Sequence, residues 1–179
     1  MSKPYQMSQS YVMSDDAVRF ATMIMAGQGV SNEGAAIIAE CLVEADLRGV
    51  QTHGLSRLPV YVERVQRGIV KAVPNMKLEK PVAACALLDG DNGFGFLVGR
   101  RARREAITMA DSCGVGVVAA RNSNHFGMAA TYLLQAVKAG YFAFVFTNAA
   151  KAMPPWGGRE VFLRTSPFGA AAPAGKRPP

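Results

Sequence analysis

The chain of 179 residues has little cysteine and only two histidines. Its three cysteines, Cys41, Cys85 and Cys113, lie far apart, and none belongs to a Cys-x-x-Cys motif. An odd number of widely spaced cysteines is not the pattern of a disulfide framework or of a structural zinc site. We therefore expect reduced, buried thiols and no metal.

The sequence also lacks long apolar runs. No stretch approaches the ~18 apolar residues of a membrane-spanning helix, and the N-terminal Met-Ser-Lys-Pro-Tyr-Gln has no apolar secretory core. Hydrophobic residues nonetheless make up 50% of the chain, which is enough to bury the core of one large domain or two small ones. These features predict a folded, cytoplasmic protein.

Acidic residues are in the minority. The 20 Lys and Arg against 13 Asp and Glu give a net charge of +7, which admits acidic partners from nucleic acid to a phosphorylated cofactor. Part of this charge is concentrated in Arg100, Arg101, Arg103 and Arg104. No aromatic residue is interleaved with them to stack on bases, so we interpret them as the outer face of a helix and disfavour nucleic acid as a partner.

Hydrophobic spacing predicts a helical unit at residues 14–75 and an α/β domain at residues 76–179. Helices are expected at 14–27 with Ser14 as the N-cap, at 31–48, and at about 56–68. The second unit is expected to have strands at 82–88, 115–120 and 142–147, helices at 97–111 and 128–138, a turn at 89–93, and an irregular segment beyond residue 148. The predicted fold class is α/β.

The segment Gly93-Phe94-Gly95-Phe96-Leu97-Val98-Gly99 follows a predicted strand and opens a predicted helix, as a dinucleotide-binding fingerprint does. The fingerprint G-x-G-x-x-G needs glycine at its sixth position, which is Val98 here, and an acidic residue about 20 positions further on, which is missing. The sequence therefore argues against a Rossmann fold, and we expect these glycines to serve a tight turn.

One candidate site is the segment Gln51–Tyr61, which contains His53, Arg57 and Tyr61. Pro59 suits the first turn of a helix. Arg57 and Tyr61 would then lie one turn apart on one face, with His53 on the loop before them. A proton carrier near neutral pH beside a guanidinium group suits a small carboxylate substrate with a reactive oxygen. The alternative is a helix-capping histidine with a solvated arginine.

The second histidine, His125, lies in Arg121-Asn122-Ser123-Asn124-His125-Phe126-Gly127-Met128, between a predicted strand and a predicted helix. Ligands of α/β proteins gather at such points, and a helix N-terminus favours an anion. A histidine that only caps its own helix is the alternative. Two histidines, each at a helix start, are more suggestive together than either is alone.

Five blocks occur in order along the chain: THGLSRLPVYVERVQRG, DGDNGFG, RNSNHFGMAATYL, PWGGRE and PAGKRPP. Together they resemble the malate/L-lactate dehydrogenase family of the non-Rossmann type, from about Ser14 to Pro179. The resemblance implies a helical domain packed on a mixed-sheet, non-Rossmann cofactor domain, in dimers or higher oligomers. It also implies interconversion of a 2-hydroxy acid, or a related imino acid, with its 2-oxo form by means of NAD or NADP.

The resemblance further implies roles for individual residues. His53 and His125 match histidines that donate or accept the proton in different members, and Thr52 stands where several members have serine. Arg57 and Tyr61 match contacts to the substrate carboxylate. The segment His125, Phe126, Gly127, Met128 and Ala129 matches a cofactor contact. Of the two histidines we favour His125 as the proton carrier, because it borders that segment.

Members of the family are nearly twice as long as this chain. We therefore expect the front part of a longer protein, with the substrate side and part of the cofactor site, and no activity of its own. Neither the hydroxy acid nor the choice between NAD and NADP follows from these residues. The alternative function is a non-catalytic remnant that binds a partner or nucleic acid through the arginine cluster.

Overall fold

The computed structural model describes residues 11–175. The polar N-terminal segment and residues 176–179 of the PAGKRPP block, both used in the sequence argument, lie outside this range. Within residues 11–175, no helix is long and apolar enough to cross a membrane.

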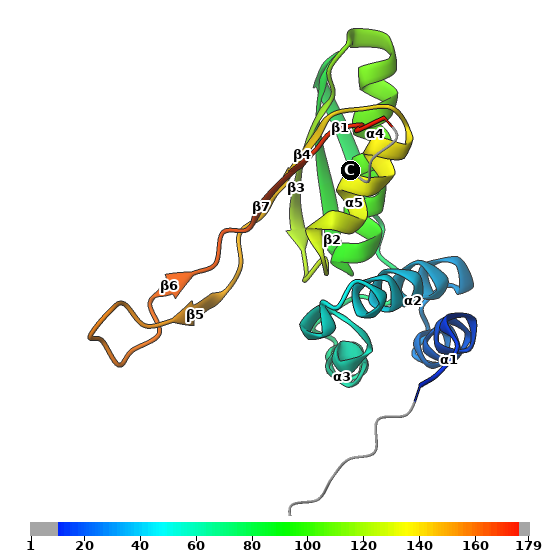
Figure 1. Ribbon diagram of the computed structural model, residues 1–179, viewed down its shortest axis with the longest axis vertical. Helices are drawn as coiled ribbons and strands as arrows, with labels where there is room; N and C mark the ends of the chain where they lie inside the picture. Colours follow the sequence, from blue (N-terminus) through cyan, green and yellow to red (C-terminus); the bar gives the residue numbers. More distant parts are fainter. Residues whose placement is uncertain (1–10, 176–179) are drawn as a thin grey trace, which may run out of the picture.

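Three helices form one end of the molecule (Figure 1): α1 (Ser14–Gly27), α2 (Asn32–Leu47) and α3 (Leu58–Gln66). Ser31 caps α2, because its hydroxyl accepts the N–H of Gly34 at 3.1 Å. The prediction that Ser14 caps α1 is wrong, since Met13 is at the N-cap and no side chain of the described residues caps that end. Helix α3 begins later than predicted because two 3-10 turns, η1 (Gln51–His53) and η2 (Leu55–Arg57), precede it.

A three-stranded mixed sheet follows, in the order β1-β2-β3. Strand β1 (Lys77–Val82) pairs antiparallel with β2 (Cys85–Gly93), which pairs parallel with β3 (Val117–Ser123). The predicted strand at 82–88 is therefore wrong in its boundaries, because it crosses the β1–β2 turn. The predicted turn at 89–93 is the end of β2, where Asp91 and Asn92 take φ values of 47° and 59° and distort the strand without ending it.

Two helices accompany the strands. Helix α4 (Gly95–Cys113) packs on β2 and β3, and α5 (Ala129–Lys138) packs on β4 and β7. The main core joins the helical end to this part: Phe94 and Phe96, which are 1% and 0% exposed, pack in one cluster with Met25, Ile38 and Leu42. The division at residues 75 and 76 stays a prediction, and this shared core crosses it.

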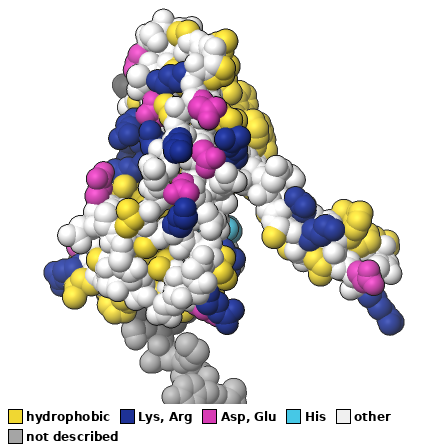
Figure 2. Space-filling view, turned by 180° about the vertical axis from the view of Figure 1, so that it is seen from behind, with side chains coloured by type: hydrophobic (Ala, Val, Ile, Leu, Met, Phe, Trp, Pro, Cys, Tyr) yellow, Lys and Arg dark blue, Asp and Glu magenta, His cyan; other side chains and the backbone are white. Residues whose placement is uncertain are grey.

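The segment beyond residue 148, expected to be irregular, forms strands instead. Strand β4 (Ala143–Phe146) pairs with β7 (Phe168–Ala171), and β5 (Lys151–Met153) pairs with β6 (Leu163–Arg164). Strand β4 is the strand expected at 142–147, whereas β5, β6 and β7 are short and are separated by Pro and Gly, which hides them from a periodicity argument. The β5–β6 hairpin projects from the body as an arm (Figure 1) that carries exposed hydrophobic side chains (Figure 2), Trp156 and Phe162 among them.

Two expectations about side chains need correction. The thiols are free among the described residues, but only Cys41 is buried, and Cys113 is exposed because it ends α4. The arginine cluster is not simply an outer face. Arg100 forms an ion pair with Glu40 at 3.2 Å, and Arg101 is half-buried and donates to the carbonyl of Met76 at 3.0 Å.

Candidate active site

The structure brings the two histidines together from distant parts of the sequence. His53 lies on η1, and His125 lies on the segment between β3 and α5. Their rings stack with centroids 5.4 Å apart and an interplanar angle of 28°. This contact favours the shared-site interpretation over two unrelated helix caps.

The His53 turn is closed by its own polar groups. The Thr52 hydroxyl lies 2.9 Å from Nδ1 of His53, and Nε of Arg57 donates to the carbonyl of Thr52 at 2.9 Å. The turn is fixed to α2 by Asp46, whose Oδ2 accepts the N–H of Leu55 at 2.8 Å. Asp46 could not be predicted from the sequence, because nothing in its spacing points to a turn nine residues away.

His125 has a different partner, Tyr61 of α3. The Tyr61 hydroxyl lies 2.8 Å from Nδ1 of His125. Tyr61 is only 3% exposed, and its ring makes edge contacts with Phe94 and Phe96, at centroid distances of 6.0 and 5.5 Å. The phenol is thus held by an aromatic wall and aimed at the imidazole.

Burial governs the protonation states of these groups. It is the main cause that lowers the pKa of His125 to about 4, and the charges of His53, Arg57 and Arg64 add to it. Burial, followed by Arg57, also lowers the pKa of His53. The pKa of Tyr61 rises to about 12, again chiefly through burial. At neutral pH the site therefore contains a neutral His125 and a protonated tyrosine, so His125 is a weaker candidate for a charged proton donor than the sequence suggested.

The backbone of the His125 segment is fixed to the end of β2. Nδ2 of Asn124 lies 3.0–3.1 Å from the carbonyls of Asn92 and Gly93 and from Oδ1 of Asn92. Gly95 faces the same segment, because an added Cβ there would lie 2.1 Å from the carbonyl oxygen of Asn124. The chain does turn tightly, from β2 to α4 across Phe94, but Gly95 itself serves close packing in the first turn of α4 and has no positive φ. The asparagines of RNSNHFG were the signal for this anchor, and sequence analysis gave them no role.

The segment expected to touch a cofactor, His125 to Ala129, leads into α5. Within the part of the chain that the structure describes, no side chain caps α5, and its first turn has no acidic residue. Its backbone donors therefore fit a cofactor's anionic or carboxamide group. Gly127 is buried with φ +76°, and the ring of Phe126 stacks on Tyr132 at 5.2 Å, so these two residues shape the backbone.

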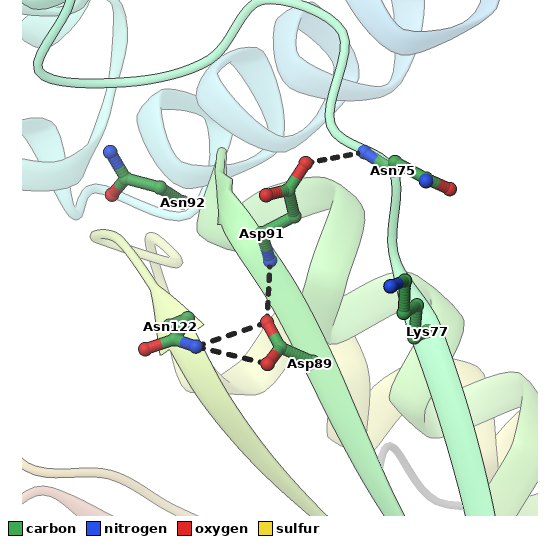
Figure 3. Close-up of a pocket in the computed structure, with 6 residues that line it drawn as sticks. All are labelled: Asn75, Lys77, Asp89, Asp91, Asn92 and Asn122. Carbon is green, nitrogen blue, oxygen red and sulfur yellow. Dashed lines mark hydrogen bonds between the residues drawn. The ribbon is translucent and has the colours of Figure 1, made fainter.

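A separate pocket of about 320 Å³ lies at the carboxyl ends of β2 and β3 (Figure 3). Asp89 accepts from the N–H of Asp91 and from Nδ2 of Asn122. Asp91 accepts from Lys71 and from the N–H of Asn75. Because the chain's own donors satisfy both carboxylates, we regard this pocket as a structural feature. Its lining residues are Asn75, Lys77, Asp89, Asp91, Asn92 and Asn122.

Comparison with known proteins assigns the chain to a family. The model of the family described as malate/L-lactate dehydrogenase matches residues 12–179. The chain belongs to this family. The resemblance seen in the five sequence blocks is therefore confirmed, and so are the mixed sheet and the α/β class.

Individual members of the family are similar over most of the chain. The L-sulfolactate dehydrogenase of Methanocaldococcus jannaschii is 42% identical over 143 residues, which cover 80% of this chain and 42% of that protein. The ureidoglycolate dehydrogenase (NAD(+)) of Escherichia coli is 34% identical over 145 residues, which cover 81% and 42%. The solved malate dehydrogenase of Pyrococcus horikoshii OT3 has a TM-score of 0.87 and 38% identity, and covers 94% of this chain and 51% of that chain.

This chain thus spans about half the length of the relatives that it matches. These relatives are all dehydrogenases, and they give no support to a nucleic-acid-binding remnant.

Proposed function

We propose that the protein, completed to the length of its relatives, interconverts a small 2-hydroxy acid with its 2-oxo form by means of NAD or NADP. The observation that carries the proposal is the His53–His125 stack, with Arg57 on the turn that follows His53. Relatives named for malate, sulfolactate and ureidoglycolate support an acid of this class.

The residues of this chain would supply binding and proton handling. A nicotinamide cofactor, when bound, supplies the hydride, and the first turn of α5 is where this chain would hold part of it. Nε of Arg57 donates to the carbonyl of Thr52, so the two terminal nitrogens of the guanidinium group would be the ones that bind the substrate carboxylate. The two imidazoles would then face the reacting oxygen. Phe94 and Phe96, which contact the ring of Tyr61, would exclude water from that side of the site.

The finer assignments stay proposals. Thr52, His53 and His125 are the proposed catalytic groups, and Arg57 is the proposed contact to the substrate carboxylate. Tyr61, which the resemblance also places on the substrate side, bonds His125 instead. Phe126, Gly127, Met128 and Ala129 are the proposed cofactor segment. The name of the Escherichia coli relative supports NAD without deciding against NADP. A homodimer is a further prediction of the family resemblance, and a cytoplasmic location stays a prediction from the sequence features alone.

The test uses the chain joined in cis to the C-terminal remainder of the Pyrococcus horikoshii malate dehydrogenase, which we call the completed chain. Reduction of a panel of 2-oxo acids, including those of malate, lactate and sulfolactate, is followed by nicotinamide absorbance with NADH and with NADPH. Turnover that is lost in the His53→Ala, His125→Ala double variant is the expected result. A folded completed chain that reduces none of these acids would reject the proposal.

Arg57→Lys tests the carboxylate contact in the same assay. Lysine keeps the charge but loses the planar two-pronged geometry, so KM for the 2-oxo acid should rise by roughly 10- to 30-fold, equivalent to about 1.4–2 kcal/mol, while KM for the cofactor changes little. Arg67→Lys is the matched control, because Arg67 is exposed and paired with Glu63 at 2.8 Å on the far end of α3. An unchanged KM for every accepted acid would show that Arg57 does not bind the substrate carboxylate.

A further inference from the structure

Tyr61 is not presented to a ligand as a free phenol. Its side chain is 3% exposed, and Phe94 and Phe96 contact its ring edge-on. The only hydrogen bond that its hydroxyl makes within residues 11–175 is to Nδ1 of His125, at 2.8 Å. This geometry conflicts with a role as a direct carboxylate contact, which the family resemblance suggested.

The direction of that hydrogen bond follows from the surroundings. If His125 donated from Nδ1, the hydroxyl hydrogen of Tyr61 would need another acceptor, and the described part of the chain offers none. A buried hydroxyl without an acceptor is unfavourable, so the hydroxyl donates. The burial that raises the pKa of Tyr61 to about 12 keeps its proton in place.

We infer that Tyr61 is a positioning residue that donates its hydroxyl hydrogen to Nδ1 of His125 and thereby holds His125 as the neutral tautomer with its proton on Nε2. The His53 stack at 5.4 Å and the Phe96 edge contact at 6.5 Å fix the orientation of the same ring. Nε2 itself has no hydrogen-bond partner in the described range, so its N–H is left for a ligand.

The consequence for catalysis rests on the proposed function. A neutral imidazole that offers Nε2–H is a hydrogen-bond donor to the 2-oxo oxygen rather than a source of a full proton. In the reduction, C2 gains a hydride from the nicotinamide, which is oxidised, and the carbonyl π electrons move to oxygen. That oxygen takes a proton that reaches it from solvent through His53: solvent protonates the imidazole, which passes the proton on and is left neutral. Because the pKa of His53 is lowered as well, its imidazolium is a minor form at neutral pH. The Tyr61–His125 pair thus leaves the proton-carrier role to His53.

The tautomer can be measured without any activity, on the 179-residue chain itself. Nitrogen-15 NMR of the histidine rings distinguishes a protonated ring nitrogen from an unprotonated one at neutral pH. We expect His125 to have its proton on Nε2 in the wild type, and to populate both tautomers in Tyr61→Phe. Tyr141→Phe is the control, because that hydroxyl is bonded to Asp111, away from the site, and it should leave the His125 signals unchanged. A proton on Nδ1 in the wild type overturns the inference, even if Tyr61→Phe fails to fold.

Kinetics of the completed chain give a second readout. Tyr61→Phe should lower kcat by roughly tenfold and leave KM for the 2-oxo acid within about twofold, because it disturbs the orientation of His125 and not the grip on the carboxylate. A rise in KM with unchanged kcat would indicate that Tyr61 contacts the substrate carboxylate directly, and would overturn the positioning role. Complete inactivity of the wild-type completed chain would reject the proposed function, while the NMR result would still decide the tautomer.

Discussion

At the scale of single residues, the site depends on atoms that have no chemical role of their own. Gly54 separates η1 from η2, and an added Cβ there would lie 1.8 Å from Oδ1 of Asp46. That carboxylate holds the N–H of Leu55, so the absence of a side chain at Gly54 lets α2 fix the turn that carries His53 and Arg57.

Gly54→Ala should therefore displace Asp46 and loosen the turn. We expect a loss of roughly 1–3 kcal/mol in the free energy of unfolding, typical of overpacking, and a fall in kcat/KM of the completed chain. Urea denaturation and the nicotinamide assay measure the two effects. Gly27→Ala is the control, because no atom of the described residues lies within 4 Å of its added Cβ. Equal stability of the two variants would contradict this account of Gly54.

Acid should destabilise the fold through His125. Its pKa falls from 6.5 to about 4 in the folded chain because of burial and nearby positive charge. The unfolded chain thus binds a proton between these pH values that the folded chain does not. The stabilisation is complete above pH 6.5 and is lost as pH falls toward 4. We expect about 2 kcal/mol from this group, after discounting for its partial exposure.

Urea denaturation of wild type and His125→Gln across this pH range would measure that contribution. The variant's stability should depend less steeply on pH between 6.5 and 4. Some slope should remain, because the pKa of His53 is lowered as well. Identical slopes for the two proteins would show that His125 does not titrate as its burial requires.

At the scale of elements, helix starts show what one hydrogen bond contributes. Ser31→Ala should cost about 1 kcal/mol of stability, because it removes the acceptor for the N–H of Gly34 at the start of α2. Ser14→Ala, at the start of α1, should cost much less, since Ser14 is not the N-cap and, among the described residues, no side chain caps that helix. Thermal unfolding of the two variants compares them directly. A larger loss for Ser14→Ala would reverse this assignment.

The helices were predictable from sequence because each carries its own apolar periodicity, and the position of Pro59 in the first turn of α3 followed from local chemistry. The strands were predictable only in part: those expected at 115–120 and 142–147 correspond to β3 and β4, whereas β1, β5, β6 and β7 were not predicted. Asp91 and Asn92 have the composition of a turn, yet they are held in β2 by Lys71, Asn75 and Asn124, which are distant in the sequence. The two histidines could be named from sequence, but the Tyr61–His125 bond joins residues that only tertiary packing brings together.

At the scale of the whole molecule, the β4–β7 pair and the β5–β6 arm leave a large apolar surface exposed. Phe144, Phe146, Trp156 and Phe168 are all more than half exposed, although side chains of this size are usually buried. Two-stranded sheets of this kind are marginally stable without something to pack against. The body around α2, α4 and the His53–His125 pair has, by contrast, a closed core.

We therefore expect the 179-residue chain alone to fold around its core but to self-associate, and to show no reduction of 2-oxo acids by NADH or NADPH. The first expectation follows from the exposed aromatic surface. The second follows because hydride transfer needs a preorganised cofactor, and this chain contributes only the α5 end of its proposed site. Circular dichroism would confirm folding, and light scattering over a concentration series would detect association.

The completed chain should be less prone to associate and should turn over substrate in the same assay. Turnover by the 179 residues alone would mean that they contain the whole active centre. A monomer that persists at every concentration would contradict the expectation that the exposed aromatic side chains of the β5–β6 arm cause self-association.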